Sequence, residues 1–197
     1  ITAAAKASCD LIQNCALEVK TIDKQNLDAK TTEYFERFGS VSYFLETLNK
    51  CIYNMSKNQF FMTFFISLID TQNMKISFAS AAHDYPFIYK SSKEGGKFDS
   101  LFVKGGARLG EFFNSKYQVM EMDILKNDVI VWYTDGLIDC TNSSMSVYGE
   151  RRFREQIIKN HRFDVKDIRD NILNNALVFY GVEKKIDDIT LVVAKII

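Results

Sequence analysis

The chain has 197 residues, of which 25 are basic and 25 are acidic. This balance gives no net field to attract nucleic acid or an anionic membrane, and no apolar stretch approaches the roughly 20 residues of a transmembrane helix. The length suits one domain over residues 1–197. We therefore expect a cytoplasmic protein. These residues should contact neither nucleic acid nor membrane, and their specificity should come from a local site.

The cysteines and the chain start indicate the setting of the protein. No Cys-x-x-Cys pair and no histidine at zinc-ligand spacing occurs, which predicts free thiols in a reducing compartment rather than a thiolate metal site. The chain opens on Ile1 rather than on methionine, and its first residues lack the long apolar core of a signal peptide. We interpret it as part of a longer protein.

Two amphipathic helices are predicted near the beginning. The first covers residues 1–20, where apolar side chains recur at steps of three and four, and a polar connector follows. The second begins after Ser40, which we expect to cap it, and ends near residues 57–58. Its apolar face consists of Val41, Phe44, Leu45, Leu48, Ile52 and Met55.

The middle of the chain changes to strand character. Residues 60–69 and 74–81 are rich in aromatic and β-branched side chains and flank a turn at 70–73, which predicts a β-hairpin with one strand buried on both faces. Residues 105–110 are interpreted as a flexible surface loop. Further strands are predicted at residues 87–89, 99–103, 117–122 and 129–133.

The last third is predicted to form two helices followed by one strand. Amphipathic helices are predicted after Gly149, with Phe153, Ile157 and Ile158 on the apolar face, and from Asp164 to Gly181. A final strand covers residues 189–197. Because there is no regular βαβ repetition, the order favours an antiparallel α+β layered fold over a Rossmann-like one.

Two acidic segments carry the strongest chemical signal. Asp135 falls at the end of the strand 129–133, where Gly136 frees the backbone to turn, and Asp187 with Asp188 leads into the last strand. If the two strands are neighbours, Asp135 and Asp187 converge, and convergent carboxylates suit Mg²⁺ or Mn²⁺. The alternative is that Asp-Gly is turn chemistry alone. Two carboxylates are too few for a binuclear centre, so ligands are missing or the site is vestigial.

Other catalytic arrangements are weaker. A glycosidase carboxylate pair is disfavoured because no aromatic sugar platform stands beside either acid. His83 could be a general acid, although a histidine in this position is more often a hydrogen-bonded loop residue. Ser80 and His83 lack a nucleophile-elbow sequence, and the glycines of 105–110 lack the lysine of a nucleotide loop.

Six segments in order resemble the SpoIIE/RsbU branch of the metal-dependent protein phosphatase 2C superfamily. They begin with the strand FMTFFISLID at 61–70 and the loop AAHDYP at 81–86, and end with DDITLVV at 187–193. Between them lie Leu109-Gly110, YTDGLID at 133–139 and YGERRF at 148–153.

The resemblance implies an antiparallel β-sandwich flanked by helices, with a binuclear Mn²⁺ or Mg²⁺ centre. Asp135 and Asp187 match metal ligands, and Gly136, Asp139, Asp188 and His83 are expected near the site. The implied substrate is a phosphorylated regulatory protein, such as an anti-sigma-factor antagonist, in bacterial signalling. A sensor domain is expected upstream in the parent chain. The apolar face of the second helix is interpreted as core, with a partner-responsive interface as the alternative.

The chain departs from the family pattern at two places. Ala82 stands where the family has glycine, and Asp84 where it has asparagine. The acidic strand and turn that precede the first helix in the family have no counterpart here, so we expect a domain truncated at its N-terminus, with its N-terminal strands missing. Such a piece should be inactive alone and prone to self-association. The alternative function is a noncatalytic phosphatase-like interaction module.

Overall fold

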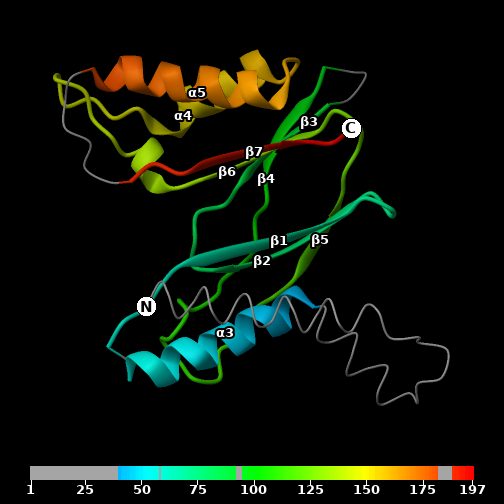
Figure 1. Ribbon diagram of the computed structural model, residues 1–197, viewed down its shortest axis with the longest axis vertical. Helices are drawn as coiled ribbons and strands as arrows, with labels where there is room; N and C mark the ends of the chain where they lie inside the picture. The colour runs from blue at the N-terminus through cyan, green and yellow to red at the C-terminus, as the bar shows by residue number, and fades with distance from the viewer. Residues whose placement is uncertain (1–39, 58, 92–94, 182–187) are drawn as a thin grey trace. The chain divides into compact units, whose positions relative to one another are not determined.

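The computed structural model describes residues 40–57, 59–91, 95–181 and 188–197 (Figure 1). The chain divides into two compact units, one made of residues 1–83 and 103–122, the other of 84–102 and 123–197. Each unit contains one antiparallel sheet; within the described residues the first unit adds one α-helix and the second adds two, which confirms the predicted α+β class. None of the helices in the described ranges is long and apolar enough to span a membrane. The helix predicted for residues 1–20 lies outside the described residues.

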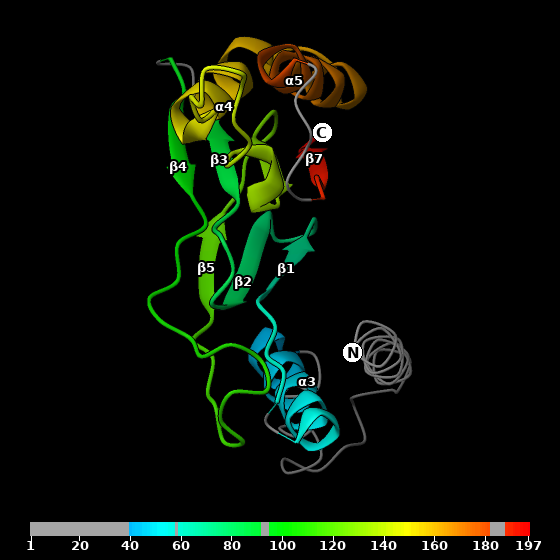
Figure 2. The same ribbon diagram turned by 90° about the vertical axis from the view of Figure 1, so that its left-hand side faces the viewer.

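The first unit is built on the predicted hairpin. Strands β1 (Phe64–Asp70) and β2 (Lys75–Ala81) pair antiparallel, and β5 (Met120–Asp123) lies beside β2 (Figure 2). The Asp70 carboxylate accepts hydrogen bonds of 2.9 Å from the backbone N–H groups of the two turn residues Gln72 and Asn73. The first residue of β2 is exposed. The others are buried on both faces of the sheet, as predicted, apart from one that is half-buried.

Helix α3 (Val41–Ser56) packs one face against this sheet. The helix and its end are as predicted, and burial of its face is confirmed for Val41, Leu45, Leu48 and Ile52, whereas Phe44 is half-buried. The prediction was wrong for Met55, which is 62% exposed. It was also wrong for the Ser40 cap.

The Ser40 residue stands at the N-cap position, but its side chain does not cap the helix. Its hydroxyl bonds the hydroxyl of Ser42 at 3.2 Å instead of a backbone N–H group. The extended backbone of Ser40 is typical of an N-cap residue. Ser40 therefore marks the start of the helix, although its hydroxyl bonds the Ser42 side chain and not a helix N–H group.

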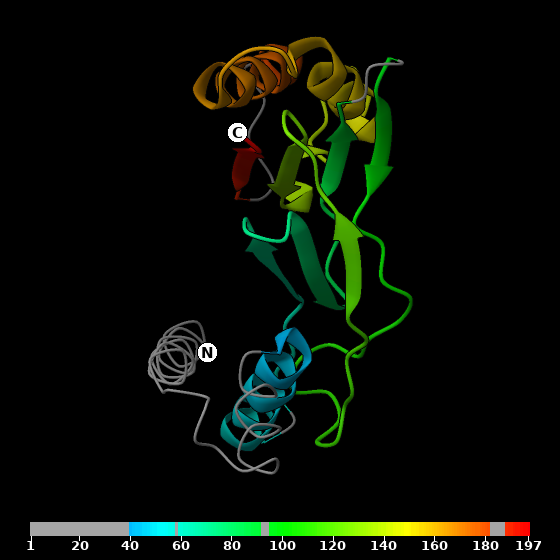
Figure 3. The ribbon, with the colours of Figure 1, turned by 90° about the vertical axis from the view of Figure 1, so that its right-hand side faces the viewer.

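The second unit has four strands in the order β4-β3-β6-β7. They are β3 (Phe87–Lys90), β4 (Lys97–Ser100), β6 (Val129–Tyr133) and β7 (Leu191–Lys195). Helices α4 (Gly149–Asn160) and α5 (Val165–Tyr180) lie on one face of this sheet (Figures 1 and 3). The core between them contains Phe87, Val131, Phe153, Ile157, Ile168 and Ile172.

Helix α5 follows its sequence signals closely. The Asp164 side chain accepts a 2.9 Å hydrogen bond from the Asp167 backbone, and Gly181 with φ 66° ends the helix. The predicted apolar stripe is Val165, Ile168, Ile172, Ala176 and Phe179. Ile168, Ile172 and Ala176 are buried as predicted and Phe179 is half-buried, but the prediction was wrong for Val165, which is 39% exposed. The caps worked as predictors because they satisfy backbone groups locally, without help from the rest of the fold.

Several boundaries and surfaces differ from the predictions. β4 begins two residues earlier and ends three earlier than predicted, because its register is set by pairing with β3 from Phe87↔Ser100 to Lys90↔Lys97. β5 begins at Met120 instead of residue 117. Ile158 on α4 is 44% exposed, so its assignment to the buried face was wrong. The surface-loop interpretation of 105–110 was wrong for its last two residues, Leu109 and Gly110, which are buried.

Candidate functional site

The site begins where strand β6 ends. Val129, Val131 and Tyr133 are buried, Thr134 continues in extended conformation, and a single 3₁₀ turn follows at Asp135–Leu137. The Asp135 carbonyl accepts 2.8 Å hydrogen bonds from the backbone N–H groups of Ile138 and Asp139. This short turn leaves Asp135 exposed at the sheet edge, while Gly136 behind it is buried.

Strand β7 runs beside β6, so the second acidic segment reaches the same edge. The last pair of the ladder is Tyr133↔Leu191. Beyond it, the Thr134 N–H donates to the Thr190 carbonyl at 3.1 Å, and the Thr190 N–H donates to the Thr134 hydroxyl oxygen at 2.9 Å. The same hydroxyl donates to the Asp188 carbonyl at 3.1 Å. The condition for convergence, that the two strands are neighbours, is met.

Of the other residues expected at the site, the structure places only some near Asp135. Asp139 and Asp188 are both exposed, and each is tied to the Asp135 turn: Asp139 through its N–H group and Asp188 through Thr134. Asp187 lies outside the described residues. His83 belongs to the other compact unit, where its backbone N–H bonds the Ser80 hydroxyl at 3.2 Å. The metal-binding roles of these residues stay predictions.

Aromatic packing fixes the strand under the site. The Tyr133 ring stacks on Phe87 with centroids 5.3 Å apart and meets Phe153 of α4 edge-on at 4.8 Å. Burial raises the pKa of Tyr133 well above its ordinary value, and the negative charges of Glu150, Asp84 and Asp139 add to the rise. The positive charge of Arg154 opposes this rise in the pKa of Tyr133 without cancelling it, so the hydroxyl stays protonated at neutral pH.

Sequence reasoning missed Thr134, and it missed that Glu150 and Asp84 lie near Tyr133. Thr134 sits between the strand and Asp135 and holds the acidic segment 188–190 in place through its side chain. The signal was available in the Tyr-Thr-Asp-Gly motif itself, but its meaning depends on which strand lies next to β6. Glu150 and Asp84 gave no signal because only tertiary structure brings them near Tyr133.

The donor chemistry of this edge fits a hard divalent cation, but the number of donors does not complete its coordination. Carboxylate oxygens are the ligands that Mg²⁺ and Mn²⁺ prefer, and Asp135 offers one at an exposed position. Within the residues that the structure describes, no group of three His, Cys, Asp or Glu side chains could hold a metal ion. The described part of the edge therefore supplies only a share of a metal site.

Solved structures define the fold class. The SiaA-PP2C domain of Pseudomonas aeruginosa superposes with a TM-score of 0.67 at 18% identity, covering 83% of this chain and 65% of that one. The Mn-presoaked phosphatase domain of SpoIIE from Bacillus subtilis gives a TM-score of 0.55 at 16% identity, covering 96% and 73%. The fold is that of the PP2C-like domains.

Sequence comparison then gives the family. The family model of stage II sporulation protein E (SpoIIE) matches residues 19–197, and the chain belongs to this family. The phosphoserine phosphatase RsbU of Bacillus subtilis is 26% identical over 155 residues, which are 78% of this chain. The chain spans 44% of the length of RsbU.

Proposed function

We propose that this chain is the C-terminal part of a metal-dependent serine/threonine phosphatase domain in bacterial partner-switching signalling. The observation that carries the proposal is the bonding of Thr134 to Asp188 and Thr190, which brings the two acidic motifs to one edge of the sheet. Membership of the SpoIIE family and the similarity to RsbU, a phosphoserine phosphatase, support it.

The proposed substrate is phosphoserine or phosphothreonine on a small regulatory protein, such as an anti-sigma-factor antagonist. A sensor domain upstream in the parent chain and a cytoplasmic location belong to the same proposal.

Asp135 and Asp187 are the proposed ligands of a binuclear Mn²⁺ or Mg²⁺ centre. Such a centre, when bound, supplies an activated water and Lewis acidity at the phosphate. Gly136 lies buried in the 3₁₀ turn behind Asp135, and Asp139 and Asp188 add negative charge beside it. The similarity to a domain solved after presoaking with manganese supports this choice of metals.

The decisive test uses the longer parent protein. Hydrolysis of a generic aryl phosphate and of a phosphoserine peptide is measured with Mn²⁺, with Mg²⁺ and with a chelator. We expect activity only with metal and its loss in Asp135→Asn, while Asp170→Asn, which removes a surface ion pair with Arg169 on α5, remains active. Activity that survives chelation, or full activity of Asp135→Asn, excludes the proposal.

For the 197-residue chain by itself we propose weak metal binding and no useful activity. Two carboxylates cannot supply the bridging oxygens that a binuclear centre needs. We also expect self-association through an uncovered sheet edge. Calorimetric titration with Mn²⁺ and a sizing measurement check both parts. Sub-micromolar binding of two ions by a monodisperse monomer contradicts them.

A noncatalytic interaction module is the second candidate. Ala82 supports it, because this residue adopts a left-handed backbone with φ 56° at the place where the family has glycine. The parent sequence upstream decides between the two functions: replacement of the two acidic motifs there favours the module, and their presence favours the enzyme.

A further inference from the structure

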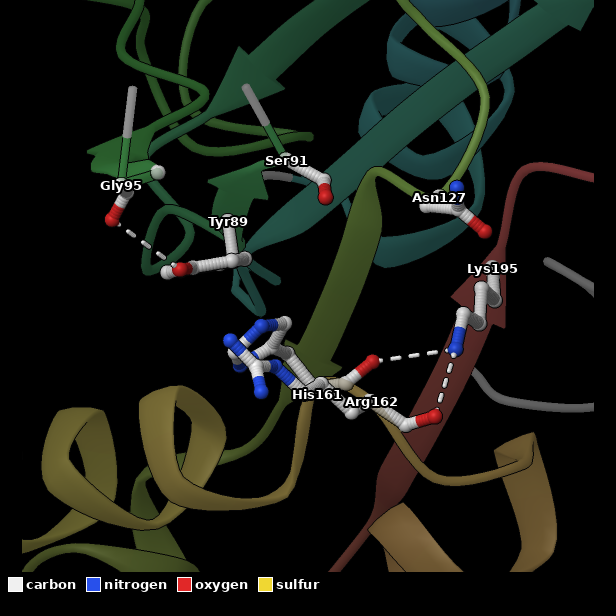
Figure 4. A pocket seen from close by; sticks show the side chains of 8 residues that line it. Tyr89, Ser91, Gly95, Asn127, His161, Arg162 and Lys195 are labelled. Carbon is white, nitrogen blue, oxygen red and sulfur yellow. Dashed lines mark hydrogen bonds between the residues drawn. The ribbon is translucent and has the colours of Figure 1, made fainter. Parts of the chain in front are cut away.

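A polar cavity of about 340 Å³ lies in the second unit, away from Asp135 (Figure 4). Its wall includes Asn127, which lies two residues before β6, and Lys195, which ends β7 and pairs with Val129. Asp135 follows the opposite end of β6. The cavity and the proposed metal site at Asp135 therefore lie at opposite ends of β6.

The side chains that line the cavity are cationic or uncharged. His161, Arg162 and Lys195 contribute the basic groups, and the described lining contains no aspartate or glutamate. Asp128, which follows Asn127, is fully buried, and Lys90 pairs with it at 3.3 Å. Glu94, which precedes Gly95, lies outside the described residues. The lining that the structure describes therefore carries positive charge.

Lys195 fixes the loop that carries the other two basic groups. Its Nζ donates to the carbonyls of His161 at 3.0 Å, Arg162 at 3.3 Å and Phe163 at 2.8 Å. These carbonyls follow the C-terminal end of α4, where a cation is favoured by the helix dipole. In Figure 4 Lys195 reaches this loop from β7. Three hydrogen bonds from Lys195 of β7 therefore hold the loop in place.

The His161 ring is also held in place, by one hydrogen bond and one ring contact. Its Nδ1 lies 2.6 Å from the Ile158 carbonyl, so Nδ1 carries the proton that makes this bond. The ring packs on Tyr89 with centroids 4.3 Å apart, and the Tyr89 hydroxyl bonds the Gly95 carbonyl at 3.5 Å. The His161 ring therefore forms a fixed wall of the cavity.

Arg162 provides the donors that the structure does not otherwise use. Its side chain is exposed beside the cavity, and within the described residues it makes no ion pair. A guanidinium presents two parallel N–H groups that match the oxygens of a phosphate. Ser91 and Asn127, which also line the cavity, add a hydroxyl and an amide.

From this arrangement we propose that the cavity is a binding site for a small phosphate monoester. The phosphate is held by Arg162, with Lys195 supplying positive charge and Asn127 or Ser91 a further hydrogen bond. The volume accommodates a phosphate with a modest organic group. The site is independent of the proposed phosphatase centre, because none of its residues belongs to the acidic motifs.

The test is a titration of the ¹⁵N-labelled 197-residue chain with inorganic phosphate and with phenyl phosphate, at a concentration where a sizing measurement shows a single species. Chelator is present and ionic strength is fixed. We expect saturable amide shifts centred on Ser91, Asn127 and residues 161–163. Arg162→Glu should weaken binding at least about tenfold, since it replaces a charge-assisted donor pair by a repulsive charge. Arg162→Lys should retain part of the affinity.

Two control variants make the outcome decisive. Arg151→Glu changes the same charge on an exposed side of α4, and Asp170→Asn removes a surface ion pair on α5; both should bind phosphate like the unchanged chain. Absence of saturable shifts overturns the proposal. So does equal weakening by Arg162→Glu and Arg151→Glu, which indicates diffuse surface charge. Neither result bears on the phosphatase proposal.

Discussion

Thr134 joins the end of β6 to Asp188, since its hydroxyl donates to the Asp188 backbone carbonyl at 3.1 Å. The same oxygen accepts from the Thr190 N–H at 2.9 Å. One side chain therefore satisfies two backbone groups of the segment that follows Asp187. The arrangement explains how an exposed acidic segment can hold a defined position beside Asp135.

Replacing Thr134 by Val should release this segment. Valine keeps the branched shape that β strands favour but makes neither bond, so we expect a loss of about 1–2 kcal/mol in the free energy of unfolding. Hydrogen exchange at the Thr190 amide should accelerate in particular. Thr71→Val in the exposed hairpin turn is the control. Unchanged protection at Thr190 contradicts the proposed role of the hydroxyl.

Asn49 should be among the most sensitive positions of the first unit. It is fully buried on α3, its Oδ1 accepts from the Gly110 N–H at 2.8 Å, and its Nδ2 donates to the carbonyls of Phe112 and Phe113 at 2.9 and 3.2 Å. Asn49→Ala leaves these groups without their partner and should cost about 2–4 kcal/mol in a urea titration. Asn54→Ala on the exposed side of α3 should cost less than about 1 kcal/mol. Alanine is the better helix former, so propensity alone would stabilise both variants; similar losses in both would contradict a special role of the Asn49 bonds.

Asp128 anchors the second unit from inside. Its carboxylate accepts from the backbone N–H groups of Ser91 at 2.8 Å and Leu125 at 2.9 Å, and Lys90 pairs with it at 3.3 Å. Asp128→Ala should destabilise the chain by about 3–5 kcal/mol, because a half-buried cation and two amides lose their partner. Asp99→Ala, which removes an exposed pair with Lys97, should cost about 1 kcal/mol or less by chemical denaturation. A small effect at Asp128 contradicts this account.

Stability should fall in alkali because buried tyrosines resist ionisation. Burial raises the pKa of Tyr148 and of Tyr117 from 10.0 to about 12. Between these values the unfolded chain releases phenolic protons that the folded chain retains, so the stability present below pH 10 is lost as pH rises toward 12. Urea midpoints from about pH 8 to about pH 11 measure the decline.

The Tyr148→Phe variant separates this effect from general alkaline damage. The Tyr148 hydroxyl donates to the Asn175 side chain at 2.8 Å, so the variant should lose about 1 kcal/mol at neutral pH. Above about pH 10 it should decline less steeply than the unchanged chain, because one buried phenol is gone. An identical slope would mean that Tyr148 does not contribute to the pH dependence.

Ala82 offers a stabilising substitution. Its φ of 56° lies in the left-handed region, which costs an L-residue roughly 1–2 kcal/mol and costs glycine almost nothing. Ala82→Gly should raise the thermal midpoint, corresponding to about 1 kcal/mol, whereas Ala81→Gly in the buried end of β2 should lower it. A lower midpoint for Ala82→Gly contradicts the claim of strain.

Sequence alone determined the elements whose signals are local. The run 129–133 predicts β6 with its observed bounds, and Asp164 with Gly181 brackets α5, because β-branched packing and helix capping act on groups a few residues apart. Asp135 could be placed at a strand end for the same reason. The order of the motifs also indicates the family, and the match over residues 19–197 confirms it.

Tertiary structure decided what depends on partners far away in the chain. The register of β4 follows from its ladder with β3, so the apolar residues 101–103 misled the prediction of its bounds. The meeting of Thr134 with Asp188 requires that β6 and β7 pair, because the two residues are 54 positions apart. Asn49 is a polar residue on the buried face of α3, and its burial is stable because the Gly110 amide, 61 residues later, and the carbonyls of Phe112 and Phe113 satisfy it. No local pattern encodes these pairings, since they arise from burial and hydrogen bonding across the fold.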